Sequence, residues 1–295
     1  MSLVATLIAS PDDPALDPPT AVHAAAVVES GFIDWLAQGI ACDIELPSYL
    51  IAEQAEERLR AAVRGKPLDV VVQETAARRK SVLVADMDST MIRQECIDEL
   101  AAEIGLKDHV AAITARAMNG EIAFEPALRE RVALLKGLDV AVIDEVLERR
   151  ITLAPGGRQL VATMRAFGGH AALVSGGFTA FTGPVAAMLG FDEHQANVLL
   201  SENGVLTGEV AEPILGGDAK VRALESICMR LCVPLCASIA VGDGANDLPM
   251  LAHAGAGVAL HAKPAVAARA RLRIDHGDLT ALLYLQGYRR EEFVT

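Results

Sequence analysis

Residues 81–90 read SVLVADMDST and join a short run of apolar residues to two acids and two hydroxyl side chains. A continuous apolar run of four to eight residues that ends at a turn is typical of a strand buried on both faces of a parallel sheet. Two further runs, at 171–174 and 238–241, also end at polar clusters, which begin at Ser175 and Asp243. Ligands bind at the carboxyl ends of the strands in an open parallel sheet, so we expect the three clusters to converge on one crevice.

The rest of the second half of the chain alternates between strand and helix patterns, which predicts an α/β fold with a doubly wound, Rossmann-like parallel sheet. Asn203-Gly204 is a strong hairpin turn signal between two extended segments, 197–200 and 205–209. A further strand is expected at 257–260, and helices are expected at 180–189, 218–231, 248–252, 263–270 and 279–285.

Residues 94–149 have a wholly helical pattern, with apolar residues three and four apart. Four helices are expected there, at 97–104, 110–118, 127–135 and 140–147. An insertion of this length directly after the first strand is too long for an ordinary connection. We interpret it as a small helical cap packed over the edge of the sheet.

The first 75 residues have a different pattern, with strands expected at 3–8 and 68–73, two short extended pieces within 32–46, and helices at 21–30 and 52–64. This β-α-β-β-α-β order is the ferredoxin-like arrangement of a small α+β domain. The sequence therefore predicts three parts: residues 1–75, a catalytic core made of 76–93 and 151–295, and a cap at 94–150.

The composition excludes several classes of function. The chain has 295 residues, a formal net charge of −13 and a pI of about 5.0, which disfavours nucleic acid and anionic lipid as partners. No run reaches the ~18 apolar residues that a membrane helix needs. The five cysteines include no CxxC pair, and we expect Cys228, Cys232 and Cys236 to be buried or half-buried thiols. The protein is expected to be soluble and cytoplasmic.

The cluster Asp86-Met87-Asp88-Ser89-Thr90 suits metal-assisted phosphoryl transfer. One carboxylate can attack phosphorus and form an aspartyl-phosphate, and its neighbour can protonate the leaving alkoxide and later deprotonate water. A pair of acids is common on solvated loops, but this pair closes an apolar strand. We therefore take Asp86 and Asp88 as catalytic candidates.

Ser175-Gly176-Gly177 and Lys220 are candidate phosphate ligands. A hydroxyl followed by two residues without Cβ lets backbone N–H groups approach a phosphate closely. A lysine near the start of a helix can neutralise charge on a transferring phosphoryl group. Alone, the Ser-Gly-Gly motif would equally fit a simple glycine turn, and a lone surface lysine is far more often solvated, so the weight of both features comes from the other clusters.

The hexapeptide Gly242-Asp243-Gly244-Ala245-Asn246-Asp247 follows the third strand and offers hard oxygen ligands. Mg²⁺ prefers one or two carboxylates with water and substrate phosphate, and the alternative is a helix cap. Asp86, Asp88, Asp243 and Asp247 cannot share a small site with an anionic substrate unless a cation is present. The four acids therefore predict Mg²⁺ as the cofactor.

The ordered set of motifs at 86–90, 175–176, 220 and 242–247 resembles the haloacid dehalogenase superfamily and, more narrowly, its phosphoserine phosphatases. The resemblance covers about residues 81–290. It implies Asp86 as nucleophile and Asp88 as general acid and base. It also implies Mg²⁺ held by the Asp86 side chain, the Asp88 main-chain carbonyl and Asp243 with support from Asp247, and phosphate held by Ser175, Gly176, Lys220 and Asn246.

The same resemblance implies the substrate, O-phosphoserine, and the last step of serine biosynthesis. Glu95 matches the family's contact to the substrate ammonium, and Arg131 matches its contact to the carboxylate. Met118 and Phe124 match apolar cap residues that seal the pocket. Without the family, Glu95 and Arg131 would be ordinary charges on helix surfaces.

Residues 1–75 resemble the ACT-like domains that precede the catalytic domain in some bacterial members. Such domains often bind an amino acid or mediate dimerisation, so a regulatory or dimerisation role, with a homodimer, is an expectation. Two alternatives stay open: a relative that acts on another small phosphomonoester, and an amino-acid-sensing protein with a retired catalytic domain.

Overall fold

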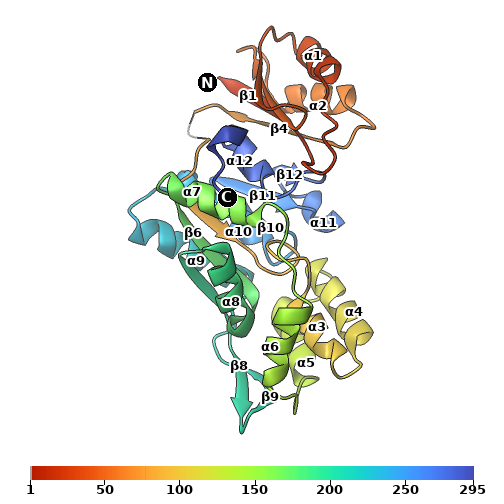
Figure 1. The fold of residues 1–295 in the computed structure, drawn as a ribbon, viewed down its shortest axis with the longest axis vertical. Helices are drawn as coiled ribbons and strands as arrows, with labels where there is room; N and C mark the ends of the chain where they lie inside the picture. The colour runs from red at the N-terminus through yellow and green to blue at the C-terminus, as the bar shows by residue number, and fades with distance from the viewer. Residues whose placement is uncertain (1, 77) are drawn as a thin grey trace.

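The computed structural model describes residues 2–76 and 78–295, and three regions follow one another along its long axis (Figure 1). The N-terminal unit lies at one end, next to α12 (Ala281–Leu285). A parallel sheet with its flanking helices lies in the middle. Four helices and a two-stranded hairpin lie at the other end.

The central sheet has six strands, and every neighbouring pair in it is parallel. From one edge to the other the strands are β7 (Glu193–Asn197), β6 (His170–Phe178), β5 (Val82–Ala85), β10 (Ser238–Gly242), β11 (Ala256–Leu260) and β12 (Leu272–Ile274). In chain order this is 3-2-1-4-5-6, the order of a doubly wound fold, as predicted. The two halves of the sheet meet between β5 and β10, where such folds bind ligands.

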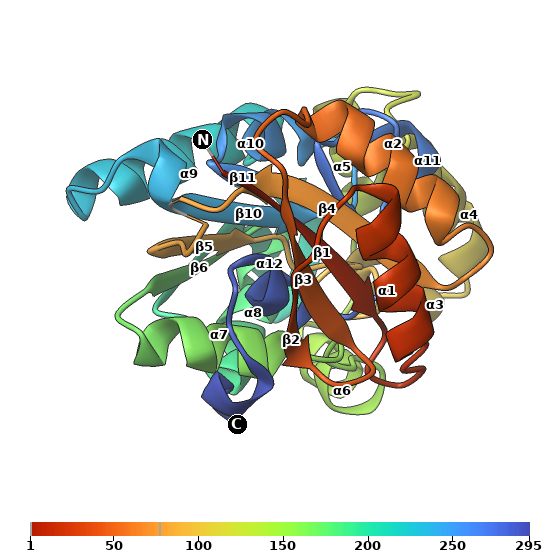
Figure 2. The ribbon, with the colours of Figure 1, turned by 90° about the horizontal axis from the view of Figure 1, so that it is seen from above.

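Both faces of the sheet are buried, which explains the continuous apolar runs. Alternate residues of β5 enter different cores: Val82 and Val84 pack on one face, and Leu83 and Ala85 pack on the other. Figure 2 shows helices on both sides of the sheet. One side has α9 (Gly217–Arg230), α10 (Leu248–His253) and α11 (Pro264–Ala267), and the other has α7 (Gly157–Ala166), α8 (Thr179–Leu189) and α12 (Ala281–Leu285).

The long connection after β5 forms the four helices that its pattern predicts, and they pack on one another. They are α3 (Cys96–Ala102), α4 (Lys107–Met118), α5 (Phe124–Ala133) and α6 (Ala141–Arg149). The hairpin of β8 (Leu199–Glu202) and β9 (Val205–Val210) lies against them, and its turn has positive φ at Asn203 (52°) and Gly204 (84°). Those angles are why Asn-Gly was a reliable signal.

The N-terminal unit is a four-stranded antiparallel sheet with two helices on one face. Its chain order is β1 (Leu3–Ala9), α1 (Pro18–Val27), β2 (Ile33–Ala37), β3 (Ala41–Leu46), α2 (Ala52–Ala62) and β4 (Leu68–Glu74). The strands lie in the order β2-β3-β1-β4, and apolar residues of both helices pack with them in a core separate from those of the parallel sheet.

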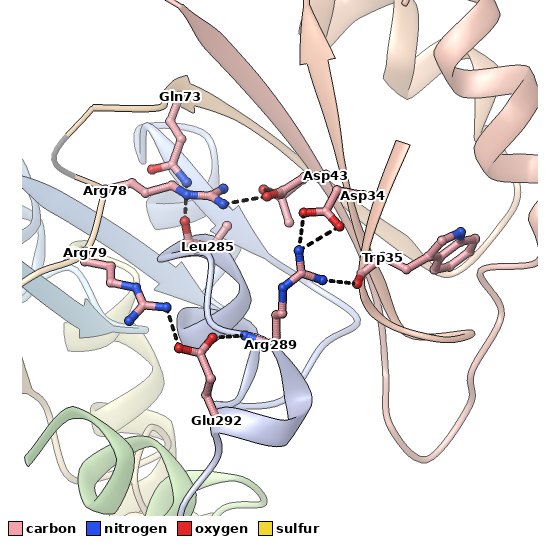
Figure 3. A network of polar contacts seen from close by, with 10 residues as sticks. Asp34, Trp35, Asp43, Gln73, Arg78, Arg79, Leu285, Arg289 and Glu292 are labelled. Atoms are coloured by element: carbon pink, nitrogen blue, oxygen red, sulfur yellow. Dashed lines mark hydrogen bonds and ion pairs between the residues drawn. The ribbon is translucent and has the colours of Figure 1, made fainter. Parts of the chain in front are cut away.

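The open face of this sheet contacts the C-terminal segment through a polar network (Figure 3). The Arg289 guanidinium donates to the Asp34 carboxylate at 2.6 Å and to the Trp35 carbonyl at 2.9 Å. Arg78, in the linker, donates to Asp43 at 2.6 Å. Arg78 and Arg289 therefore hold the N-terminal unit against the rest of the molecule.

Several sequence predictions were wrong in detail. Strand β6 does not end at Val174 but continues to Phe178, with a register shift across Ser175-Gly176-Gly177. The sequence analysis did not identify β7, β12 or α7, and the helix expected at 263–270 covers only Pro264–Ala267. Strands β7 and β12 lie at the sheet edges, where a continuous apolar run is not required.

Two further expectations concern the cysteines and the membrane. Cys228 is buried as predicted, but Cys232 and Cys236 are exposed because they follow the end of α9. Within residues 2–76 and 78–295, no helix combines the length and the hydrophobicity that a bilayer crossing requires.

Candidate active site

The parallel sheet places Asp86 and Asp243 side by side. Asp86 directly follows β5 and Asp243 directly follows β10, and these two strands are neighbours paired in register from Ser238 to Val241. The pairing continues one step beyond β5, since the Asp86 N–H donates to the Val241 carbonyl at 3.0 Å. Two acids that lie 157 positions apart in the printed sequence are therefore brought to the same point at the carboxyl edge of the sheet.

Three buried carboxylates form the centre of the site. Oxygen atoms of Asp86, Asp243 and Asp247 all lie within 4.8 Å of one another. Lys220, which is fully buried on α9, donates to Asp86 at 2.5 Å and to Asp247 at 2.6 Å. Burial disfavours the charge on this ammonium, but the two carboxylates outweigh burial and raise the pKa of Lys220.

The third carboxylate has an oxygen without a hydrogen bond. Asp243 Oδ1 accepts from the Thr90 hydroxyl at 3.2 Å, but Asp243 Oδ2 is buried with no hydrogen-bond partner among the described residues. The Lys263 ammonium is 3.6 Å from it. Burial and the charge of Asp247 raise the pKa of Asp243 to about 7. A buried carboxylate oxygen that has no hydrogen bond and lies among other acids is suited to bind a cation.

Asp88 has hydrogen-bond partners outside the group of three acids. Its Oδ1 accepts from the Cys96 N–H at the start of α3 at 2.7 Å, and its Oδ2 accepts from the Ser175 hydroxyl at 3.2 Å. Burial raises the pKa of Asp88 above its usual value, against the effect of these hydrogen bonds. A carboxyl group that is oriented and more easily protonated suits proton transfer.

Two glycines allow the close approaches that build the site. A Cβ at Gly242 would lie 2.4 Å from Cγ of Asp247, so any side chain there would displace that acid. A Cβ at Gly176 would lie 2.6 Å from the Phe124 ring, which comes from α5. Gly176 therefore lines the site without a Cβ, which leaves room for an aromatic ring to pack against it.

The helical insertion contributes two charged side chains. Glu95, at the start of α3, accepts from the Ser89 hydroxyl at 2.7 Å, and burial raises the pKa of this carboxyl well above its usual value. Arg131, on α5, is 2% exposed and donates to the Ala127 carbonyl at 3.0 Å and the Thr114 hydroxyl at 2.9 Å. Among the described residues, no carboxylate lies within 4.0 Å of its guanidinium group. Burial lowers the pKa of this group, because burial disfavours its charged form. A buried cation with only neutral partners fits an anionic group of a ligand.

These side chains enclose one cavity of about 30 Å³, between the sheet and the helical insertion. The Ala245 N–H donates to the Met118 carbonyl at 2.9 Å, so α4 contacts the loop that carries Asp243 and closes the cavity. The lining includes Asp86, Asp88, Ser175, Gly176 and Asn246 from the core, and Glu95, Met118, Phe124 and Arg131 from the insertion. The other three candidates, Lys220, Asp243 and Asp247, lie beside Asp86 within the acid cluster.

The structure also adds residues that the sequence analysis had not singled out. Ile97 and Leu128 line the cavity, and Thr114 connects Arg131 to Asp98, whose carboxylate accepts from the Thr114 hydroxyl at 2.7 Å. Lys263 lies next to Asp243. The only sequence signal for Thr114 is its place on the apolar face of α4, which does not distinguish it from a core residue.

Comparison with known protein families gives a match over most of the catalytic region. The model of the family described as haloacid dehalogenase-like hydrolase matches residues 83–252. A curated relative, a phosphoserine phosphatase of Streptomyces coelicolor, is 40% identical over 280 residues, which are 92% of this chain and 68% of the relative. The site residues described above, except Lys263, lie within the family match.

Solved structures show the same likeness in three dimensions. A HAD family hydrolase from Salmonella enterica serovar Typhi superposes with a TM-score of 0.84 at 30% identity and covers 96% of this chain and 98% of its own. A phospho-aspartyl intermediate analogue of a phosphoserine phosphatase superposes with a TM-score of 0.67 at 37% identity, covering 70% of this chain and 98% of its own.

Proposed function

The chain belongs to the haloacid dehalogenase-like hydrolases and, within them, to the phosphoserine phosphatases, and we propose that it hydrolyses O-phosphoserine to serine and phosphate through an aspartyl-phosphate on Asp86. One observation carries the choice of substrate: the cavity that contains Asp86 also contains the buried Arg131 guanidinium, which has no carboxylate partner among the described residues. In metabolism this reaction would be the last step of serine biosynthesis.

The chemistry has two displacements at phosphorus. A carboxylate oxygen of Asp86 attacks phosphorus, the bond between phosphorus and the serine oxygen breaks, and protonated Asp88 gives its proton to the departing alkoxide. Water then attacks the same phosphorus, Asp88 takes a proton from the water, and the bond from phosphorus to Asp86 breaks. The raised pKa of Asp88 supports the first of its two roles.

Mg²⁺ is the proposed cofactor, and the donor set fits it. The oxygens of Asp86, Asp243 and Asp247 lie close enough for one ion, and Asp243 Oδ2 has no hydrogen-bond partner among the described residues. When bound, Mg²⁺ would neutralise negative charge on the phosphoryl group. Since the Asp88 carboxylate already accepts from Cys96 and Ser175, its main-chain carbonyl is the group that we propose as a ligand.

The charge balance also favours a divalent cation. Five carboxylates and three cationic side chains surround the site. If all of them are ionised, their net charge is two negative charges. The groups are Asp86, Asp88, Glu95, Asp243 and Asp247, and Arg131, Lys220 and Lys263. We propose that Ser175, Gly176, Lys220 and Asn246 hold the phosphate itself.

The two ends of the substrate would be distinguished by opposite charges. Arg131 would bind the serine carboxylate with its planar guanidinium, and Glu95 would bind the ammonium. Met118 and Phe124 would seal the cavity from water. Its volume of about 30 Å³ is enough for only one or two water molecules, so we propose that residues 94–150 act as a cap that moves away to admit the substrate.

The remaining assignments are part of the same proposal. Residues 76–93 and 151–295 would form the catalytic core, and residues 1–75 an ACT-like unit for regulation or dimerisation. That unit exposes Val22, Phe32, Tyr49 and Ile51, each by at least half, and such side chains support an interface with a second copy. The presence of Asp86, Asp88, Lys220 and Asp243 argues against a retired catalytic domain.

Phosphate release from O-phosphoserine tests the proposal. EDTA should abolish it and Mg²⁺ should restore it. The ratio of kcat/KM for O-phosphoserine to that for 3-(phosphonooxy)propanoate, which lacks only the amino group, tests Glu95. We expect Glu95→Gln to reduce this ratio by about tenfold or more. Equal kcat/KM values for the two esters with the parent enzyme would show that Glu95 does not recognise the ammonium group, and would favour another phosphomonoester as substrate.

A further inference from the structure

A second and larger cavity, of about 460 Å³, lies at the amino ends of the strands of the parallel sheet, whereas Asp86 lies at their carboxyl ends. Its lining comes from the residues just before four of the strands: Lys80 before β5, Cys236 before β10, Gly255 before β11 and Arg271 before β12. On the side of the N-terminal unit it is lined by Gln73 and Glu74 at the end of β4 and by Ala76 and Arg78 after it. We call it the linker cavity.

The linker cavity is cationic in a strongly acidic protein. Its charged lining consists of Arg78, Lys80, Arg269 and Arg271 with a single carboxylate, Glu74, whereas the whole chain has 39 acidic and 26 basic residues. Positive charge is therefore concentrated here against the average of the surface. Such local concentration favours an anionic ligand.

Two of these cations have no counter-ion in the part of the chain that the structure describes. Arg269 and Arg271 are exposed, and among the described residues neither has a carboxylate within 4.0 Å. Arg78 is different, because its Nη2 donates to Asp43 at 2.6 Å, but its buried Nη1 has no hydrogen-bond partner in the described part of the chain. Lys80 donates to the Cys236 carbonyl at 2.8 Å. The two guanidinium groups of Arg269 and Arg271 together match the charge of a dianion.

Part of the remaining lining of the cavity is apolar. Leu248, Leu251 and Ala252 of α10 and Leu272 of β12 contribute side chains to it. A cavity of several hundred Å³ whose walls combine apolar groups with polar and charged ones suits a small organic molecule that carries a charge. The volume is too small for a folded partner, and the net charge of −13 disfavours nucleic acid.

We propose that the linker cavity binds a small organic phosphate, with Arg269 and Arg271 on the phosphate dianion and the apolar body against α10. Guanidinium groups bind phosphate in a planar, two-pronged geometry that an ammonium group does not provide. This site is separate from the proposed active site, which lies at the carboxyl edge of the same sheet and has a cavity of only about 30 Å³.

The two exposed cysteines provide a built-in test with AMP as the probe. Cys236 lines the linker cavity, whereas Cys232, also exposed, does not. The full chain is alkylated with iodoacetamide in EDTA, with and without millimolar AMP, and each cysteine is followed by mass spectrometry. We expect AMP to slow alkylation of Cys236 about fivefold or more and to leave Cys232 unchanged. An unchanged rate at Cys236 overturns the proposal, and equal protection by inorganic phosphate overturns the organic part of it.

A pair of double variants tests the charges. Arg269→Gln with Arg271→Gln should weaken AMP binding, measured by calorimetry, about tenfold or more. The matched control, Arg64→Gln with Arg158→Gln, removes the same charge from exposed positions outside the cavity and should leave the affinity unchanged. Equal losses in both pairs would show that AMP responds only to net charge and would overturn the site. Thermal melting verifies that all four substitutions leave the chain folded.

Discussion

Two buried aspartates, Asp69 and Asp243, show how the same side chain serves two purposes in this molecule. Asp69 is 2% exposed and Asp243 is 3% exposed, and burial raises the pKa of both. Asp69, on β4, accepts backbone N–H groups of Asp275 at 2.7 Å and Gly277 at 2.8 Å, and contacts that of His276. Asp243 accepts one hydroxyl and has one oxygen without a hydrogen bond in the described structure.

Asp69 and Asp243 differ in whether their carboxylate oxygens have hydrogen-bond partners, and not in how deeply they are buried. The Asp69 carboxylate fastens the N-terminal unit to the loop after β12, and its acceptors are occupied by fixed backbone donors. The Asp243 carboxylate lies among other acids, where its open oxygen costs stability unless a cation binds. A buried acid with fixed partners indicates structure, whereas one with an open oxygen among like charges indicates a site. The predictions below test this contrast.

The largest expected effect is on activity alone. Asp86→Asn keeps the shape of the side chain but removes the proposed nucleophile, so we expect kcat on O-phosphoserine to fall by at least about 10³-fold. The melting temperature should stay within about 5 °C of the parent, because Lys220 keeps its contact with Asp247 and the variant removes one of several mutually repelling charges. Phosphate-release kinetics and thermal melting provide the two measurements. Near-parental activity would contradict the formation of an aspartyl-phosphate on Asp86.

Lys220→Met should affect both quantities. It leaves Asp86 and Asp247 buried without the ammonium group that each of them contacts, which we expect to cost about 3–5 kcal/mol in the free energy of unfolding. Lys263→Met is the matched control, since its ammonium is 3.6 Å from Asp243 and its side chain is 36% exposed. The control should lose less than about 1 kcal/mol. Urea unfolding measures both, and a similar loss in the two variants would contradict the central place given to Lys220.

Asp69→Ala should affect stability without affecting the chemistry. It leaves backbone donors of the loop 275–277 without an acceptor, and we expect a loss of about 1–3 kcal/mol. The value of kcat should stay within about twofold of the parent under conditions where the variant is folded. A kcat loss comparable to that of Asp86→Asn, in a folded variant, would show that the contrast between the two acids is wrong.

The smallest expected effect concerns the exposed part of the same interface. Arg289→Gln removes the ion pair with Asp34, whose two side chains are 42% and 33% exposed (Figure 3). Because solvent screens such pairs, we expect less than about 1 kcal/mol. Urea unfolding compares this variant with Asp69→Ala. A loss equal to that of Asp69→Ala would mean that the interface depends on charge more than on buried hydrogen bonds.

Sequence patterns predicted some elements well and missed others for physical reasons. The strands β5, β10 and β11 were found because both faces of each are buried, which requires an uninterrupted apolar run. Strand β7, with sequence EHQAN, carries no such run because it lies at the edge of the sheet. The continuation of β6 through Ser175-Gly176-Gly177 was missed because two glycines in sequence indicate a turn, whereas here they form an irregular segment of a strand.

The candidate site also contains some residues that the sequence pattern indicated and others that it did not. The acids at 86, 88, 243 and 247 could be identified because each pair follows an apolar strand. Glu95 and Arg131 carry no such signal and were identified only through a family resemblance. The open oxygen of Asp243, the lack of a carboxylate partner at Arg131 among the described residues, and the cationic linker cavity depend on which side chains meet across long sequence separations.

The amino-acid sequence by itself determined the parallel sheet, the helical insertion and the convergence of three polar clusters, because periodicity and strand burial are local properties that a linear pattern records. Only the tertiary structure decided which acids are satisfied, how closely the helices α3–α6 cover the site, and where positive charge gathers. Those properties arise from contacts between distant residues, and the free energy of each depends on burial and on partners that no local pattern specifies.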